Sequence, residues 1–198
     1  MIDRMRSEDI PEVAKLYAEV FAGPPWNEYT RCSKGTYFGL ETKPGQLCNC
    51  CADELVLAYP SASTEKYIAK EQGKPNSASF VARKSKGIRA FVWGYSYNNP
   101  EEFVEEKSKL LVMQIKISDL LRRNGVDREF FYYSECGVDQ TYRGQGISNI
   151  LAEKIVEAAK LASQPLVMRT NWQSPMVAIA RRFDMQQIMG PEALYDPD

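Results

Sequence analysis

The stretch that decides the fold reads Val138-Asp139-Gln140-Thr141-Tyr142-Arg143-Gly144-Gln145-Gly146-Ile147-Ser148. It joins a run of β-forming residues, 130–137, to a helix-like run with apolar residues on one face. A glycine-rich turn between a strand and a helix leaves backbone N–H groups unpaired at the positive end of the helix dipole. Gly144 and Gly146 have no Cβ, so a phosphate can approach the main chain, and Arg143 adds a permanent cation. The stretch therefore predicts a phosphate-binding turn.

The turn fits neither of the two common glycine-rich nucleotide motifs. No Lys-Ser/Thr pair follows the last glycine, as in a P-loop, and the dinucleotide fingerprint needs a third glycine. The sequence resembles instead the GNAT-type N-acetyltransferases, whose motif Gln/Arg-x-x-Gly-x-Gly/Ala holds the pyrophosphate of acetyl-coenzyme A. Here the motif runs from Thr141 to Gly146, and Thr141 departs from the Gln or Arg of the family.

The order of elements after the turn supports the resemblance. The helix from Ile147 is followed by a predicted strand over 165–170, a helix opening at Ser174-Pro175, and a strand over 185–189. This order is typical of the C-terminal half of GNAT enzymes. The resemblance implies an α/β (α+β) fold with a mixed, mostly antiparallel central sheet, flanked by helices and splayed around the strand that precedes the glycine turn.

The resemblance also implies acetyl-coenzyme A as co-substrate and indicates its contacts. We expect the backbone of Val138 to bind the thioester carbonyl and the pantetheine arm, and Asn171 to bond pantetheine. The pyrophosphate is expected on the turn, where the contact residues are Arg143, Gly144, Gln145, Gly146, Ile147 and Ser148.

Glu135 matches the position at which many GNAT members keep an acidic residue that takes the proton of the acceptor amine. The alternative is a carboxylate paired structurally with an arginine, although a half-buried strand is a costly place for an idle charge. The tyrosine that usually protonates the leaving thiolate is replaced by Ala180. Its substitutes are a tyrosine elsewhere, for which Tyr133, Tyr142 and Tyr195 are candidates, or water.

The N-terminal half predicts a first helix that ends at Gly23, and an antiparallel strand pair over 79–83 and 88–97. Between them, Phe21-Ala22-Gly23-Pro24-Pro25-Trp26-Asn27-Glu28 resembles a segment that borders the acceptor pocket in a subset of GNAT enzymes. Trp26 and Glu28 are therefore candidate substrate-binding residues. The alternative is a capping loop in which Trp26 covers the core.

Four of the five cysteines lie in a predicted insertion over residues 29–58. Cys48 and Cys51 have the spacing of a zinc knuckle, and Cys32 begins a similar segment in which Gly35 replaces the second cysteine. The chain has no histidine, so a fourth ligand would be Cys50, a carboxylate such as Asp53, water, or a group from another subunit. Two readings stay open: structural zinc held by Cys32, Cys48 and Cys51, or a relic ribbon that packs without metal.

A second predicted insertion, residues 100–125, carries a helical apolar stripe and ends at Gly125, a natural C-terminal cap. It is either a lid over the acceptor side or a packing or dimer element.

The chain also stops about where a GNAT member would begin its final strand, which leaves a sheet edge open or filled by a partner subunit. A homodimer is one expectation.

Length and composition indicate one soluble enzyme-sized domain, and the resemblance implies a single GNAT acetyltransferase domain, residues 1–198, with these two insertions. Hydrophobic residues make up 44% and charged residues 26% of the chain, as in ordinary globular proteins. A net charge of −1 argues against nucleic acid as a partner, and neither a membrane span nor a signal peptide is visible. We expect a cytoplasmic protein with reduced cysteines.

Two functions from different classes agree with the sequence. One is an N-acetyltransferase that moves an acetyl group from acetyl-coenzyme A to a primary amine of a small molecule or protein. The acidic side chains of Glu28 and Glu135 favour a cationic amine. The other is a non-catalytic module that binds acyl-coenzyme A or a partner on the same fold.

Overall fold

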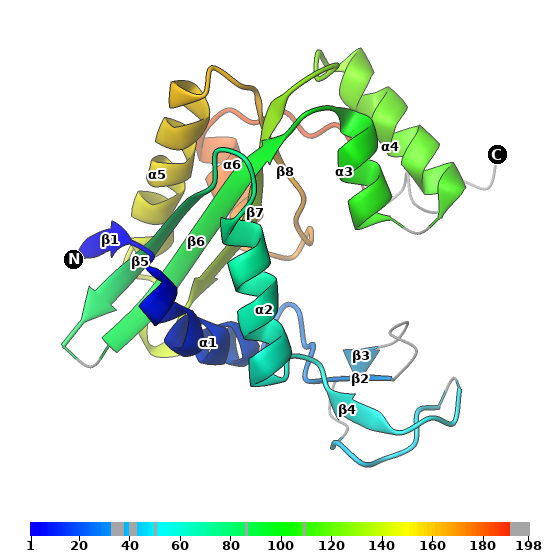
Figure 1. Ribbon diagram of the computed structural model, residues 1–198, viewed down its shortest axis with the longest axis vertical. Helices are drawn as coiled ribbons and strands as arrows, with labels where there is room; N and C mark the ends of the chain where they lie inside the picture. The colour runs from blue at the N-terminus through cyan, green and yellow to red at the C-terminus, as the bar shows by residue number, and fades with distance from the viewer. Residues whose placement is uncertain (33–37, 40–42, 50, 86, 109, 191–198) are drawn as a thin grey trace.

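The computed structural model describes residues 1–190 apart from 33–37, 40–42, 50, 86 and 109. Its centre is a five-stranded sheet in the order β1-β5-β6-β7-β8 (Figure 1). All neighbours pair antiparallel except β7 and β8, which are parallel. The strands are β1 (Ile2–Arg4), β5 (Ala78–Lys84), β6 (Gly87–Tyr97), β7 (Phe130–Val138) and β8 (Leu166–Met168). The predicted mixed, mostly antiparallel sheet is confirmed.

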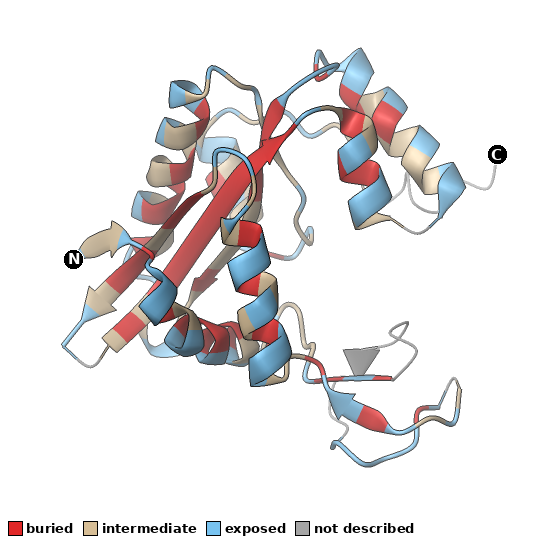
Figure 2. Cartoon of the chain, viewed as in Figure 1, coloured by how far each residue is buried: buried red, intermediate tan, exposed pale blue. Residues whose placement is uncertain are grey.

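Helices cover both faces of this sheet. One face packs against α1 (Ile10–Ala22) and α2 (Ser61–Gln72), and the other against α5 (Ile147–Leu161) and α6 (Met176–Arg182). Figure 2 shows the consequence: buried residues follow the central strands and the helix sides that face them, whereas the outer helix sides are exposed. The molecule therefore has two apolar cores separated by the sheet. Short 3-10 turns, η1 (Ser7–Asp9) and η2 (Gln140–Tyr142), precede α1 and α5.

A β-bulge interrupts the alternation of side chains along β7. Trp93 of β6 pairs with Glu135, but the next residue, Gly94, pairs with Tyr133, so Ser134 is the extra residue. Without the bulge, Ser134 and Glu135 would point to opposite faces of the sheet. With it, both side chains bond to residues of α1 or α2. The bulge therefore turns Glu135 toward the α1–α2 face.

Strands β7 and β8 pair only at their beginnings. The parallel register joins Phe131 to Leu166 and ends with Tyr133 opposite Met168. Beyond this point the bulged half of β7 has no strand neighbour on that side among the described residues. The two strands part there, as expected for a sheet that is splayed around the strand before the glycine turn.

The predicted helical insertion, residues 100–125, contains two helices, α3 (Pro100–Lys107) and α4 (Leu111–Arg123). The sequence suggested one apolar stripe, but Ser108 adopts an extended backbone and ends α3. Asn99 caps α3 by accepting the N–H of Glu102. Gly125, with a φ of 79°, follows α4 as predicted for a left-handed C-terminal cap.

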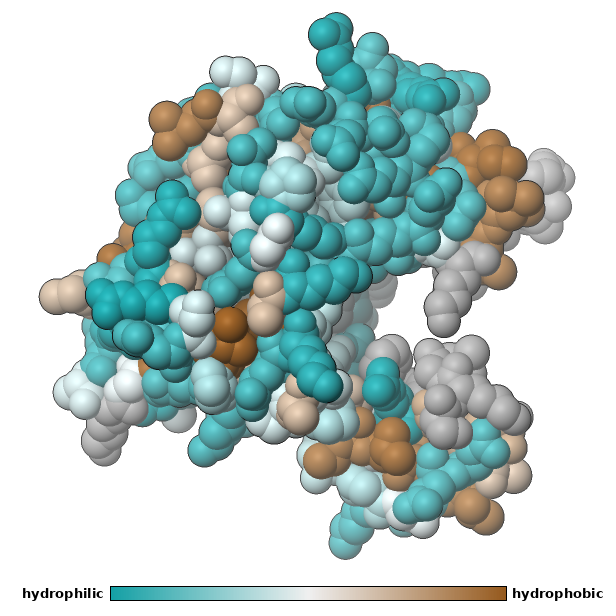
Figure 3. Space-filling view, viewed as in Figure 1, coloured by the Kyte–Doolittle hydropathy of each residue, from teal (hydrophilic) through white to brown (hydrophobic). Residues whose placement is uncertain are grey.

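The predicted insertion over residues 29–58, called the cysteine insertion below, has a small sheet of its own, ordered β3-β2-β4. Its strands are β2 (Thr30–Cys32), β3 (Phe38–Gly39) and β4 (Leu55–Leu57). It lies beside the end of α1 and the start of α2, away from the central sheet (Figure 1). Figure 3 shows an open hollow between this insertion and the α3–α4 pair.

The predicted strand over 185–189 is not formed. Its residues pack elsewhere: Ile188 lies against the α1–α2 core, and Gln186 donates to Asn124 after α4. β8 is consequently an edge strand among the described residues. None of the described helices has the length and apolar character needed to cross a membrane.

Candidate active site

A pocket of about 180 Å³ opens where β7 and β8 part. Its walls come from four segments that are distant in sequence: the end of α1 with the following loop, the bulged end of β7, the glycine turn, and the start of α6. The lining residues are Val20, Pro24, Pro25, Trp26, Cys136, Gly137, Val138, Tyr142, Arg143, Gly144, Gly146, Ile147, Ser148, Ser174, Pro175, Met176 and Ile179.

The glycine turn presents a row of backbone donors to this pocket. The N–H groups of residues 144–148 have no acceptor among the described residues, and α5 begins without a side-chain cap. Gly144 and Gly146 have φ values of 76° and 75°, which L-residues with a Cβ rarely adopt. A Cβ at either position would meet nothing within 4 Å. The turn therefore leaves both the donors and the approach to them open, as a phosphate site requires.

Arg143 connects two walls of the pocket. Its Nε donates to the carbonyl oxygen of Val138 at 3.2 Å, and a terminal nitrogen lies 3.5 Å from the carbonyl oxygen of Pro24. Both acceptors are neutral carbonyl oxygens, so no carboxylate offsets the guanidinium charge in these two contacts beside the unpaired N–H groups. The neighbouring Arg89 is engaged elsewhere, in an ion pair of 3.0 Å with Asp139.

Two residues expected at the coenzyme do not line the pocket. Gln145 lies in the turn but outside the lining set. Asn171 lies in the loop after β8, where its side-chain oxygen accepts the N–H of Gln173 at 2.9 Å. The lining is supplied instead by the loop end and first turns of α6, including Ser174 and Met176. The sequence signal for them is the helix start at Ser174-Pro175, which by itself indicates only a secondary-structure boundary.

Glu135 is partly buried in a cluster of aromatic rings on the α1–α2 face. Tyr67 donates to its Oε1 at 3.1 Å and Tyr17 at 3.3 Å. Burial raises the pKa of Glu135 to about 7, and the two tyrosine hydroxyls and the charge of Lys107 limit the rise. A carboxylate with a pKa near 7 is half ionised at neutral pH and suits general-base catalysis.

The other two acceptor-side candidates border the same aromatic cluster. Trp26 packs on Phe21, with ring centroids 5.4 Å apart, and also lines the pocket described above. Glu28 accepts the hydroxyl of Tyr59, whose ring lies 5.0 Å from that of Tyr17. Burial raises the pKa of Glu28, and the bond from Tyr59 opposes the rise. The segment after α1 thus lines the pocket and also contacts the cluster of aromatic rings that surrounds Glu135.

Of the tyrosines considered as substitutes for the missing acid, one lines the pocket. Tyr142 is that residue, at the glycine turn. Tyr133 is buried in the α5–α6 core, where burial holds its pKa well above the usual range. Tyr195 lies outside the described residues. Ala180, at the position of the usual tyrosine, lies on α6 and does not line the pocket.

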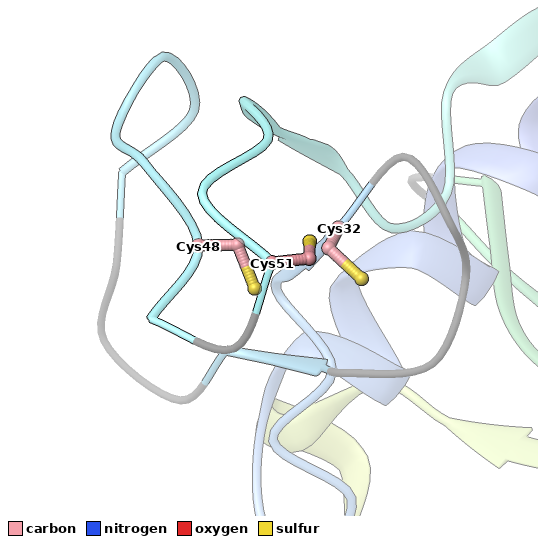
Figure 4. Close-up of side chains that lie close together, drawn as sticks. All are labelled: Cys32, Cys48 and Cys51. Carbon is pink, nitrogen blue, oxygen red and sulfur yellow. The ribbon is translucent and has the colours of Figure 1, made fainter.

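Three cysteine thiols come together in the cysteine insertion. The Sγ atoms of Cys32, Cys48 and Cys51 all lie within 4.8 Å of one another (Figure 4). A tight turn brings two of them together, because Cys48 donates its N–H to Asp53 and accepts the N–H of Ala52. Tetrahedral Zn–S bonds of 2.3 Å require sulfurs about 3.8 Å apart, so small side-chain shifts would fit a metal. No fourth ligand among the described His, Cys, Asp and Glu residues belongs to the group. Gly35 and Cys50 lie outside the described residues.

Solved structures match this fold over nearly the whole chain, whereas no protein-family model and no curated protein matches its sequence. An aminoglycoside 6'-N-acetyltransferase from Acinetobacter haemolyticus gives a TM-score of 0.56 at 9% identity, covering 96% of this chain and 93% of that chain. One from Acinetobacter baumannii gives 0.55 at 8%, covering 96% and 92%. A protein from Agrobacterium tumefaciens assigned as an acetyltransferase gives 0.52 at 15%, covering 94% and 93%. The chain therefore has the GNAT fold that these acetyltransferases share.

Proposed function

We propose that the protein is an N-acetyltransferase that transfers the acetyl group of acetyl-coenzyme A to a primary amine. The observation that supports the proposal is the β7 bulge, which turns Glu135 to the α1–α2 side of a strand whose other side borders the pocket. The strand thus separates a donor-rich anion turn from a carboxylate that ionises near neutral pH.

The coenzyme would occupy the pocket between β7 and α6. Its pyrophosphate would accept the N–H groups of residues 144–148, with Arg143 as the nearest cation. The apolar side chains of Val20, Met176 and Ile179 suit the pantetheine arm. The arm would run along the half of β7 that lacks a strand neighbour, where the thioester carbonyl comes within reach of the backbone of Val138.

Glu135 would then act as the general base. An alkylammonium gives one proton to its carboxylate, and the freed nitrogen lone pair forms a C–N bond with the thioester carbonyl carbon. The C–S bond breaks, and the departing thiolate takes the second amine proton directly, or takes the proton of Tyr142 while Tyr142 receives the second amine proton. The products are the amide, free coenzyme A and a protonated Glu135, which returns its proton to water.

The carboxylates of Glu28 and Glu135, together with the aromatic rings around them, favour a cationic acceptor. Glu28 and Glu135 face one aromatic cluster, and rings such as those of Tyr17 and Tyr59 attract an ammonium group through their π faces. The chemical class we propose is a primary amine carried by a small molecule or by a protein.

We also propose that Cys32, Cys48 and Cys51 hold a zinc ion that stabilises the cysteine insertion. The support is the convergence of three thiols in a segment whose own apolar cluster contains little besides Leu55. A reducing, cytoplasmic location, in which these thiols stay reduced, is part of the same proposal.

Release of coenzyme A thiol, measured over a panel of primary amines, tests the enzymatic function. Amine-dependent release, together with an acetylated product of the expected mass, is the expected outcome. Tight binding of acetyl-coenzyme A without turnover on any amine would favour the non-catalytic module. Failure to bind the coenzyme at all would remove both interpretations.

A further inference from the structure

A second carboxylate lies behind Glu135. Glu71 of α2 is about 1% exposed, and its Oε2 accepts the hydroxyl of the bulge residue Ser134 at 2.9 Å. Its Oε1 lies 3.3 Å from Nζ of Lys74. Neither interaction is needed for coenzyme binding or for the proton transfer described above. A single hydroxyl group, that of Tyr67, separates Glu71 from the proposed base, Glu135. Glu71 therefore lies close enough to act on that base.

Tyr67 lies between the two carboxylates. Its hydroxyl oxygen is 3.1 Å from Oε1 of Glu135 and 3.4 Å from Oε2 of Glu71. A phenol has one proton to donate, so it can satisfy only one ionised carboxylate at a time. Tyr67 itself stays neutral, because burial and the two negative charges raise its pKa far above the usual range. Two carboxylates therefore compete for one hydroxyl proton.

The competition depends on the protonation state of Glu135. When Glu135 is ionised, the shorter contact favours donation from Tyr67 to Glu135. When Glu135 has taken the proton of the amine, its own O–H can donate to the oxygen of Tyr67, and the phenol can turn to Glu71. Glu71 thus accepts the hydroxyl of Tyr67 only when Glu135 is protonated. The negative charge of Glu71 also favours the protonated form of Glu135.

We propose that Tyr67 and Glu71 are positioning residues that set how strongly Glu135 holds a proton, with Tyr67 as a hydroxyl switch between the two carboxylates. This inference rests on the proposed function, since it describes the base of that reaction. It applies to the free protein as well, because every group involved belongs to the chain.

The other groups around Glu135 do not form this bridge. From α1, Tyr17 donates to the same Oε1 but has no second carboxylate partner among the described contacts. Lys107 at the end of α3 acts through its charge. The remaining titratable neighbours, each coupled to Glu135 by charge, are Tyr59, Tyr132 and Cys136.

Two substitutions should move the titration of Glu135 in opposite directions. Glu71→Gln removes a negative charge and leaves the Tyr67 proton to Glu135, so the midpoint should fall by about one pH unit. Tyr67→Phe removes a donor to the ionised form, so the midpoint should rise by about one pH unit. A residue that only supports the fold would not produce opposite signs.

Carbon-detected NMR of protein labelled at the glutamate carboxyl carbons measures the midpoint without any turnover. The resonance of Glu135 is assigned by its loss in Glu135→Gln. Glu101→Gln is the matched control, because Glu101, like Glu71, accepts a serine hydroxyl and pairs with a cation, but its partners Ser118 and Arg122 are not among the groups around Glu135. In this control variant, the titration midpoint of Glu135 should stay within a few tenths of a pH unit of the wild-type value.

Opposite shifts in the two variants, with the control unmoved, would support the switch. Equal midpoints in all variants, or shifts of the same sign, would overturn it. If Glu71→Gln fails to fold, the sign of the Tyr67→Phe shift still decides, because a fall or no change contradicts the proposal. Absence of acetyl transfer by the wild type would refute the proposed function and leave these titrations unaffected.

Discussion

In the proposed reaction, Glu135 determines the pH dependence. Only the ionised form of a general base can take the amine proton, and burial raises the pKa of Glu135 to about 7. The logarithm of kcat/KM should therefore rise with unit slope below pH 7 and level off above it, until an amine or an acid titrates. Glu135→Gln should lower turnover by roughly two to four orders of magnitude and remove this limb.

Steady-state rates between pH 5 and 9, with calorimetry for coenzyme affinity, check this prediction. The affinity for acetyl-coenzyme A should change little, because Glu135 faces the α1–α2 side of the sheet. Near-native turnover of the variant across this range would make Glu135 a structural carboxylate.

The residue types at the site could be predicted from the sequence better than their partners could. The glycine turn and Glu135 form a local pattern within one strand-turn-helix segment. Tyr17 and Tyr67 lie 118 and 68 positions from Glu135 in sequence, and nothing in the local pattern indicates that they bond to it. The bulge at Ser134 was equally hidden, since it arises from the pairing of two strands.

At the scale of single elements, the glycine turn has a matched control within the chain. Gly146 and Gly125 have φ values of 75° and 79°, and a Cβ at either would meet nothing within 4 Å. A valine at each position should therefore introduce similar backbone strain, about 1–2 kcal/mol.

Gly146→Val should abolish coenzyme binding, because its side chain would fill the approach to the N–H groups of the turn. Gly125→Val, after α4, should lose similar stability and keep wild-type affinity. Calorimetry and denaturant unfolding of both variants measure the two effects. Equal affinity in both variants would remove the glycine turn from the coenzyme site.

The cysteine insertion should respond to metal independently of the sheet. If Cys32, Cys48 and Cys51 bind zinc, the protein prepared without an affinity tag should carry close to one zinc per chain. Cys48→Ser should lose the metal, whereas Cys136→Ser, which changes a thiol on β7, should retain it. Elemental analysis of the three proteins decides the matter, and zinc well below stoichiometry in the wild type would leave a relic ribbon.

Periodicity predicted the elements that pack one face on the sheet. The first helix, the helix after the glycine turn and the β5–β6 hairpin all form where their apolar patterns indicate. The failures have tertiary causes: Ser108 divides the helical insertion into two helices, and residues 185–189 pack on other partners instead of joining the sheet. Such choices depend on contacts that a local pattern does not contain.

At the scale of the whole molecule, the pocket joins segments from both halves of the chain, because α1, β7, the turn and α6 all line it. A bound coenzyme should therefore stabilise the entire fold. At 100 times the dissociation constant, a ligand that binds only the native state adds about 2.7 kcal/mol. For a chain of this length the melting temperature should rise by roughly 5–10 °C.

Differential scanning calorimetry over a series of acetyl-coenzyme A concentrations measures this rise. Acetyl-pantetheine, which keeps the acyl arm but lacks the pyrophosphate and the nucleotide, provides the comparison and should give a much smaller shift. A melting temperature that does not depend on coenzyme concentration would contradict a pocket that links the two halves of the chain.

The segment from Pro24 to Glu28 has a thermodynamic consequence. At one end it lines the proposed coenzyme pocket, and the carbonyl oxygen of Pro24 accepts a bond from Arg143; at the other end Glu28 accepts the hydroxyl of Tyr59 beside the proposed acceptor site. A ligand that shifts one end changes the free energy of binding at the other. The two substrates then alter each other's dissociation constants by one common factor, whichever binds first. A closed cycle of four calorimetric titrations should show this equality, and a factor of one would mean that the segment holds the two sites independently.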